Sequence, residues 1–220
     1  SLDAAGATQK RYSCNGSFKR DEDRLQVEED ILSRCAGVSA YSQGKWRLYV
    51  GAPHDATLAL TVDDLRADMD VTPAPPRRDR WNRIAGTYQD PDQNWEATDF
   101  PPVENAFYAA QDNGEVLTRD IELRYTNDPI AAQRLAKIML ERGRQGVTVN
   151  FPAKLTAMPV TVWSVVTITD AELGWTQKKF RVLNRRLTQN GLGVDLDLQE
   201  EADASYDWNF GDATTVDLAP

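Results

Sequence analysis

The sequence has little of the side-chain chemistry that most enzymes use. It contains one histidine, His54, and two cysteines, Cys14 and Cys35, and no CxxC pair. A zinc centre is therefore not expected. A Ser-His or Cys-His centre would have to use His54, which lies in GAPHDATL beside neither a nucleophile elbow nor a glycine-rich oxyanion loop. We interpret His54 as a loop residue and the cysteines as free thiols, with a Cys14–Cys35 bridge left open as the alternative.

Other absences narrow the class of protein further. No run approaches the ~18–20 apolar residues that cross a bilayer, and no signal peptide is visible, so no membrane span is expected. No P-loop or GxGxxG occurs, and QNGLGVD reads as a hairpin turn. The net charge of −9 argues against sequence-specific or general nucleic-acid binding. Because the chain begins with Ser1, we expect a fragment of a longer protein.

The most conspicuous local pattern is QDPDQNWEATDFPP, residues 89–102. Asp90, Asp92 and Asn94 occupy positions 1, 3 and 5 of a calcium loop, but Trp95 and Pro101 stand where an EF-hand needs glycine and a bidentate carboxylate. Local turns made by Asp and Asn explain the same residues without metal. A glycosidase-like carboxylate pair would draw on Asp90, Asp92, Glu96 and Asp99, but solvated loop acids are far commoner.

The first third of the chain contains signals for a helix, a hairpin and a break. Apolar spacing and Gly37 predict a short helix at 24–36, and VSAYSQGKWRLYVGA predicts a β-hairpin around Ser42–Gln43–Gly44. TLALTVDDL predicts a further strand, and PAPPRRDR at 73–80 predicts an extended connector. We interpret the basic cluster there as a solvated connector rather than a phosphate contact; it comprises Arg77, Arg78, Arg80 and Arg83.

The rest of the chain favours strands around one helix. WNRIAGTYQD and EVLTRDIELRY predict strands, and Asp128 as N-cap with Pro129 at the first helical position predicts a helix over 128–143. Every later segment alternates or is β-branched, as in LGVDLDLQEE. We therefore predict a β-rich α+β fold: a smaller α+β domain at 1–75, and an antiparallel barrel- or sandwich-like domain at 76–220 with an inserted helix at about 128–143.

Long strings of the sequence carry a family resemblance. RRDRWNRIAGTYQDPDQNWEATDFPPV, DIELRYTNDPIAAQRLAKIMLERGRQGVTVNFPAKL and LGWTQKKFRVLNRRLTQNGLGVDLDLQEEADASYDW resemble the hub region of the central tail-tip, or tip attachment, proteins of long-tailed phages. The opening part, from RYSCNG to YVGAP, is similar to the preceding hub segment. PVTVWSVVTI departs from the family, because a glycine-containing turn is expected near Trp163–Ser164.

The resemblance implies a structural protein of the virion, made in the bacterial cytoplasm. Such hubs are homotrimers that cap the tail tube, contact tube and distal tail proteins, and carry host-recognition modules, here expected outside the fragment. The family offers no catalytic, cofactor or metal residue, so none is assigned. Two alternatives stay open: a receptor- or carbohydrate-binding module of the tail tip, and a tail-associated glycan hydrolase. The tryptophans at 46, 81, 163, 175 and 208 are expected in cores or subunit interfaces.

Overall fold

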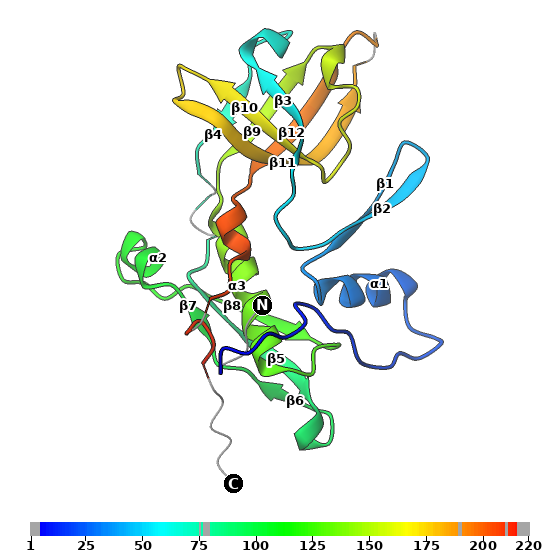
Figure 1. The fold of residues 1–220 in the computed structure, drawn as a ribbon, viewed down its shortest axis with the longest axis vertical. Coiled ribbons are helices and arrows are strands. Elements are labelled where there is room, and N and C mark those ends of the chain that lie inside the picture. Colours follow the sequence, from blue (N-terminus) through cyan, green and yellow to red (C-terminus); the bar gives the residue numbers. More distant parts are fainter. Residues whose placement is uncertain (1–4, 75, 77–79, 189–190, 210, 215–220) are drawn as a thin grey trace. The chain divides into compact units, whose positions relative to one another are not determined.

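The computed structural model describes residues 5–74, 76, 80–188, 191–209 and 211–214. The helices are α1 (Arg24–Ser33), α2 (Ala106–Gln111) and α3 (Pro129–Arg144). The strands are β1 (Val38–Ser42), β2 (Lys45–Tyr49), β3 (Ala56–Thr61), β4 (Asp70–Thr72), β5 (Arg83–Asp90), β6 (Glu96–Asp99), β7 (Val103–Glu104), β8 (Thr118–Leu123), β9 (Thr148–Ala153), β10 (Val165–Asp170), β11 (Trp175–Leu187) and β12 (Val194–Glu200). This content confirms the predicted β-rich α+β fold class (Figure 1).

The chain forms two compact units, and each is assembled from separate stretches of sequence. Unit 1 comprises the described residues up to Val38, those in 80–144, and those from Ser205 on; unit 2 comprises those in 39–79 and 145–204. This grouping differs from consecutive domains at 1–75 and 76–220. The strands β3 and β4 pair with β10 and β9, which come about 80 to 110 residues later, so the early strands join the late sheet. The expected boundary at 75/76 itself falls partly outside the described residues.

Unit 1 is a four-stranded sheet with a helix packed on it. β5 is central: it pairs antiparallel with β6 and β7 and parallel with β8. Asp128 accepts a hydrogen bond from the Ile130 amide at 2.9 Å, as an N-cap does, and the apolar stripe of α3 packs against β5 and β8. The buried residues of this core are Ile84, Tyr88, Phe100, Leu123, Ala132, Leu135, Ala136 and Leu140. The predicted helix thus forms, and its core partner is the β5 sheet.

Unit 2 is a curved six-stranded sheet in the order β3-β10-β11-β12-β9-β4 (Figure 1). Val194, Leu196 and Leu198 of β12 are buried while Asp195 and Asp197 between them are partly exposed, as the alternating pattern predicted. Within the described residues, β3 and β4 are the free edges of this sheet, so it is open rather than closed into a barrel. The β3–β10 pair is parallel, in an otherwise antiparallel sheet.

The turn before β10 explains the unusual PVTVWSVVTI string. Trp163 has φ 68°, a left-handed conformation that favours glycine, so the expected turn is present without its glycine. The Trp163 amide donates to the Val182 carbonyl at 2.7 Å, and the Arg181 guanidinium lies 5.7 Å from the indole ring. These contacts to β11 hold a bulky residue in a backbone conformation that costs about 1–2 kcal/mol.

Candidate functional site

The acidic stretch singled out in the sequence forms the connection between β5 and β6. Asp90, the last residue of β5, is 4% exposed; its Oδ1 accepts from the Asp92 amide and its Oδ2 from the Tyr88 hydroxyl, both at 3.0 Å. The Asp90 side chain thus forms an Asx turn, as the local-turn interpretation predicts for this residue. Burial, together with the hydrogen bond to Asp90, raises the pKa of Tyr88 above its ordinary value, so the hydroxyl stays a donor. No group of three or more His, Cys, Asp or Glu side chains suited to a metal ion occurs among the described residues.

Two consecutive residues of this connection have left-handed backbone. Asn94 has φ 59° and Trp95 has φ 63°, and the Trp95 amide donates to the Asp90 carbonyl at 2.8 Å. Asparagine tolerates this conformation, but a tryptophan there is a genuine outlier. The Trp95 side chain is 49% exposed, so core packing does not compensate for its backbone strain. The loop therefore presents Trp95 toward solvent from a strained backbone position.

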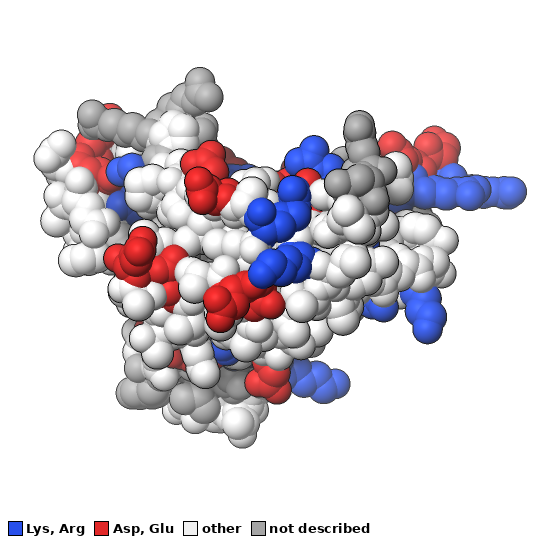
Figure 2. All heavy atoms as spheres, turned by 90° about the horizontal axis from the view of Figure 1, so that it is seen from above, with Lys and Arg blue, Asp and Glu red and all other residues white. Residues whose placement is uncertain are grey.

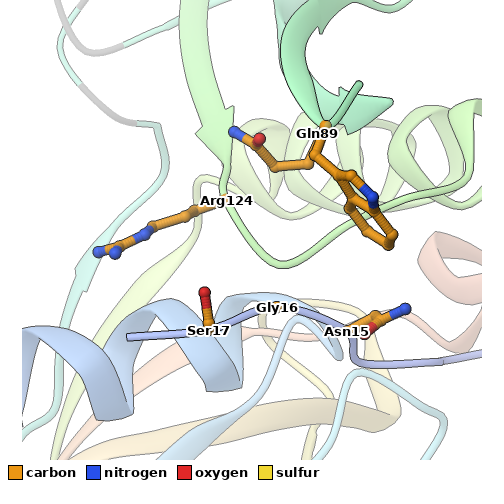
Figure 3. A pocket seen from close by; sticks show the side chains of 6 residues that line it. Asn15, Gly16, Ser17, Gln89 and Arg124 are labelled. Carbon is orange, nitrogen blue, oxygen red and sulfur yellow. The ribbon is translucent and has the colours of Figure 1, made fainter. Parts of the chain in front are cut away.

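A cavity of about 520 Å³ opens beside Trp95, and we call it the Trp95 pocket (Figure 3). Its lining comes from three parts of unit 1: Asn15, Gly16 and Ser17 in the N-terminal segment, Gln89 and Trp95 around the β5–β6 connection, and Arg124 just after β8. Figure 3 shows Gln89 across the opening from the segment that carries Asn15 and Ser17. The volume falls in the range typical of small-molecule sites.

Tertiary contacts hold the walls of the Trp95 pocket. The Asn15 amide donates to the Tyr125 carbonyl at 3.3 Å, and the Gln89 amide donates to the Thr126 carbonyl at 2.8 Å. Gly16 allows this approach, because a Cβ there would lie 2.4 Å from Cδ1 of Tyr125. The N-terminal segment is also anchored by Arg34, which donates to the Ser13 carbonyl.

The charged residue of the pocket is already paired. Nη1 and Nη2 of Arg124 each donate to a carboxylate oxygen of Glu22 at 2.8 Å, a bidentate ion pair. These side-chain hydrogen bonds lower the pKa of Glu22 to about 2. The guanidinium therefore lies beside a carboxylate that stays ionised at every ordinary pH.

We expect the Glu22 carboxyl to titrate near pH 2, well below the ~4.3 of an unperturbed glutamate. Because the pKa of Glu22 is depressed in the folded state, the ion pair stabilises the folded state fully above about pH 4.3. This stabilisation is lost as the pH falls through about 2. Carboxyl ¹³C shifts followed by NMR would measure the midpoint. In an Arg124→Gln variant the midpoint should return toward the ordinary value; an unchanged midpoint would contradict the assignment of the shift to Arg124.

The other residues considered from the sequence are not gathered into one site. Asp92, Glu96 and Asp99 are exposed around β6 in unit 1, while Nε2 of His54 lies 3.0 Å from the Val50 carbonyl oxygen in unit 2. Cys14 and Cys35 are both free thiols, as interpreted. In the basic cluster, Arg77 and Arg78 lie outside the described residues. The helix predicted at 24–36 forms over Arg24–Ser33, three residues shorter at its C-terminal end, and the predicted hairpin forms with Gln43–Gly44 as its turn.

The β1–β2 hairpin exposes a group of apolar side chains, which we call the hairpin surface. Tyr41 is 63% exposed, Trp46 69% and Leu48 70%, and the Tyr41 and Trp46 rings lie 5.3 Å apart between centroids. Exposed apolar groups of this kind are characteristic of contact sites. By contrast, basic and acidic side chains both occur on the face shown in Figure 2, and neither sign covers it continuously.

Sequence reasoning drew attention to Trp95 but missed Asn15, Ser17, Gln89 and Arg124. These polar residues are of common types and are spread from position 15 to position 124, so no local pattern links them.

No helix in the described residues has both the length and the apolar character that a membrane span requires.

No protein-family model matches the sequence, and no curated protein matches it. Three solved structures are similar to this chain in fold: a chain from a virion and two tail proteins. A chain from the virion of a native gene transfer agent particle has a TM-score of 0.70 at 14% identity, over 86% of this chain and 42% of that one. The tail protein of Neisseria meningitidis MC58 has a TM-score of 0.55 at 18% identity, over 87% of this chain and 59% of that one.

The 43 kDa tail protein of prophage MuSo2 from Shewanella oneidensis has a TM-score of 0.53 at 10% identity, over 86% of this chain and 54% of that one. This chain thus spans 42–59% of the length of the three chains that it resembles. At these identities the comparison concerns the fold, and it agrees with the resemblance seen in the sequence. The chain shares its fold with two tail proteins, one of them from a prophage, and with a chain of a gene transfer agent virion.

Proposed function

We propose that this chain is a structural component of a phage or prophage tail, and that it forms part of the central hub at the tail tip. The observation that carries the proposal is the fold that this chain shares with two tail proteins, at TM-scores of 0.55 and 0.53 over 87% and 86% of this chain. In this proposal the chain is the hub part of a longer protein, which agrees with its covering only 59% and 54% of the lengths of those two tail proteins. Host-recognition elements then belong to parts beyond this sequence.

The physical character of the chain supports an assembly role. A hub has to present large subunit surfaces on rigid units, and it needs no pKa-tuned catalytic centre. Each unit has a buried hydrophobic core packed against its sheet. Among its described residues, unit 2 also has an exposed apolar hairpin and two free strand edges, which can contact other subunits. The buried Asp90 is held in a turn and the net charge is −9, so we propose neither an enzymatic nor a nucleic-acid-binding role.

We further propose that the hub is a homotrimer that contacts tail-tube, distal tail and other tail-tip proteins. Closed cyclic symmetry suits a ring that caps a tube. In this proposal the hairpin surface lies in a contact between copies or with a tail protein, because Trp46 and Leu48 would otherwise leave apolar area in water. The protein would be made in the bacterial cytoplasm and act in the virion.

Particles from a host that carries the gene can test this proposal. Gold-labelled antibody against the chain should mark the end of the tail distal to the capsid, and cryo-electron microscopy should reveal three copies on the tube axis. Labelling along the tube, on the capsid, or nowhere on the particle would overturn the tail-tip assignment.

A Trp46→Ser variant tests the role of the hairpin surface. Because Trp46 is 69% exposed, the variant should fold normally but reduce the yield of complete tails at least about tenfold, the effect of losing one aromatic anchor. Leu192→Ser is the matched control, since Leu192 is 68% exposed and lies outside the hairpin. Equal assembly by wild type and Trp46→Ser would remove the hairpin from the interface while leaving the tail-tip assignment to the labelling experiment.

A further inference from the structure

We propose that the Trp95 pocket binds one neutral pyranose ring of a saccharide. The proposal concerns a binding site within unit 1 and does not depend on the tail role or on the hairpin surface. It rests on three features of the lining: an exposed aromatic face, neutral polar side chains with both donors and acceptors, and a guanidinium whose charge is already balanced.

The aromatic feature is Trp95 itself. Trp95 is 49% exposed and lines the cavity, and both Asn94 and Trp95 have left-handed backbone. Backbone strain that no core packing offsets points to a function for the side chain it positions. The electron-rich face of an indole ring attracts the polarised C–H groups on one face of a pyranose, so the ring provides a stacking platform.

The polar feature is a set of neutral side chains on both sides of the opening, with Gln89 across from Asn15 and Ser17. Asn15 and Gln89 contribute amides and Ser17 a hydroxyl, and within the described part of the chain none of these three side chains has a hydrogen-bond partner. An amide offers both a carbonyl acceptor and an NH₂ donor, and a hydroxyl offers both roles in one group. Sugar hydroxyls, which also donate and accept, match this set, whereas an aliphatic ligand would leave it unsatisfied.

The charge feature selects a neutral sugar. Arg124 would attract an acidic saccharide if it were free, but Glu22 occupies it with two hydrogen bonds of 2.8 Å. A carboxylated sugar would have to displace or approach that carboxylate, which disfavours it. The volume of about 520 Å³ accommodates one pyranose ring, and the adjoining sugar units of a longer saccharide would extend out through the opening.

The test is binding of simple methyl pyranosides to the full chain, followed by NMR. The neutral probes are the methyl glucoside, galactoside, mannoside and N-acetylglucosaminide, and methyl glucuronide is the acidic one. At least one neutral probe should shift the indole N–H signal of Trp95, with an affinity that changes little with ionic strength because no net charge is neutralised. Trp95→Ala should weaken that binding at least about tenfold and Gln89→Ala about three- to tenfold.

Two further variants make the result specific. Trp46→Ala removes another exposed tryptophan, outside the pocket, and should leave the affinity unchanged. Trp95→Phe retains an aromatic face and should keep most of the affinity, which separates loss of stacking from damage to the loop. The proposal is overturned if no neutral pyranoside binds, if methyl glucuronide alone binds, or if Trp46→Ala and Trp95→Ala weaken binding equally.

Discussion

Replacing Gly86 by alanine is expected to destabilise unit 1 by at least about 3 kcal/mol, enough to unfold it under many conditions. Gly86 pairs with Ile121 across the parallel β5–β8 ladder, and a Cβ on Gly86 would lie 1.9 Å from the Ile121 carbonyl oxygen. The clashing atom is backbone, so no side-chain rotation relieves it. The strands would have to separate at the centre of the sheet, where the Gly86 carbonyl also accepts from the Phe100 amide at 3.1 Å.

Hydrogen exchange of the β5 and β8 amides measures this effect locally, which matters because a chain of two compact units need not unfold in one step. Gly114→Ala is the matched control in the same unit. Gly114 has φ 79°, and a Cβ on it would meet no described atom within 4 Å, so only backbone strain of about 1–2 kcal/mol is expected. Equal protection in Gly86→Ala and wild type would contradict the close approach of the two strands.

Removing the buried arginine of unit 2 is expected to have an effect of similar size. Nε of Arg181 donates to Oε2 of Glu201 at 2.8 Å, and each side chain is 4% exposed. Arg181→Met leaves the Glu201 carboxylate in a buried place without its main partner, which costs about 3–5 kcal/mol. The double variant Arg181→Met with Glu201→Met removes both charges, and it should recover most of the loss because two apolar side chains can pack in their place.

Urea unfolding measures the loss in free energy of unfolding. Hydrogen exchange across β11 and β12 shows whether the loss belongs to unit 2. Arg186→Met provides the matched control on the same strand: Arg186 and Asp197 are 3.9 Å apart and their side chains are 65% and 38% exposed. An exposed pair of this kind contributes at most about 1 kcal/mol. A double variant as unstable as the single one would show that Arg181 acts through something other than Glu201.

Local patterns predicted the elements well where the reason for each element is itself local. The hairpin follows from Gln43–Gly44, both of which take positive φ in the turn, and α3 begins where the Asp128 side chain caps it. The alternation of β12 reflects one buried and one exposed face, which any half-covered sheet imposes. On β5, by contrast, period-2 spacing puts Arg83, Ala85 and Thr87 on one face, and only the structure shows that the other face, with Ile84 and Tyr88, is the deeply buried one.

The grouping of elements could not be predicted in this way. The hydrophobic stripe of α3 is compatible with any apolar sheet face, and only tertiary packing against Ile84, Tyr88 and Leu123 assigns it to unit 1 rather than to the late strands. Similarly, β3 reads as a strand from its own residues, but its parallel pairing with β10, about 110 positions further along the chain, depends on long-range closure.

The sequence by itself determined the β-rich class, the capped helix, the turns and the failure of the calcium pattern, because each depends on residues within a few positions of one another. It also determined the likeness to phage tail proteins. Only the tertiary structure decided which segments share a core, that Trp163 occupies a glycine-like turn, and that Asn15, Gln89, Trp95 and Arg124 surround one cavity. Those outcomes depend on contacts between residues far apart in the chain, and neither spacing nor composition specifies such contacts.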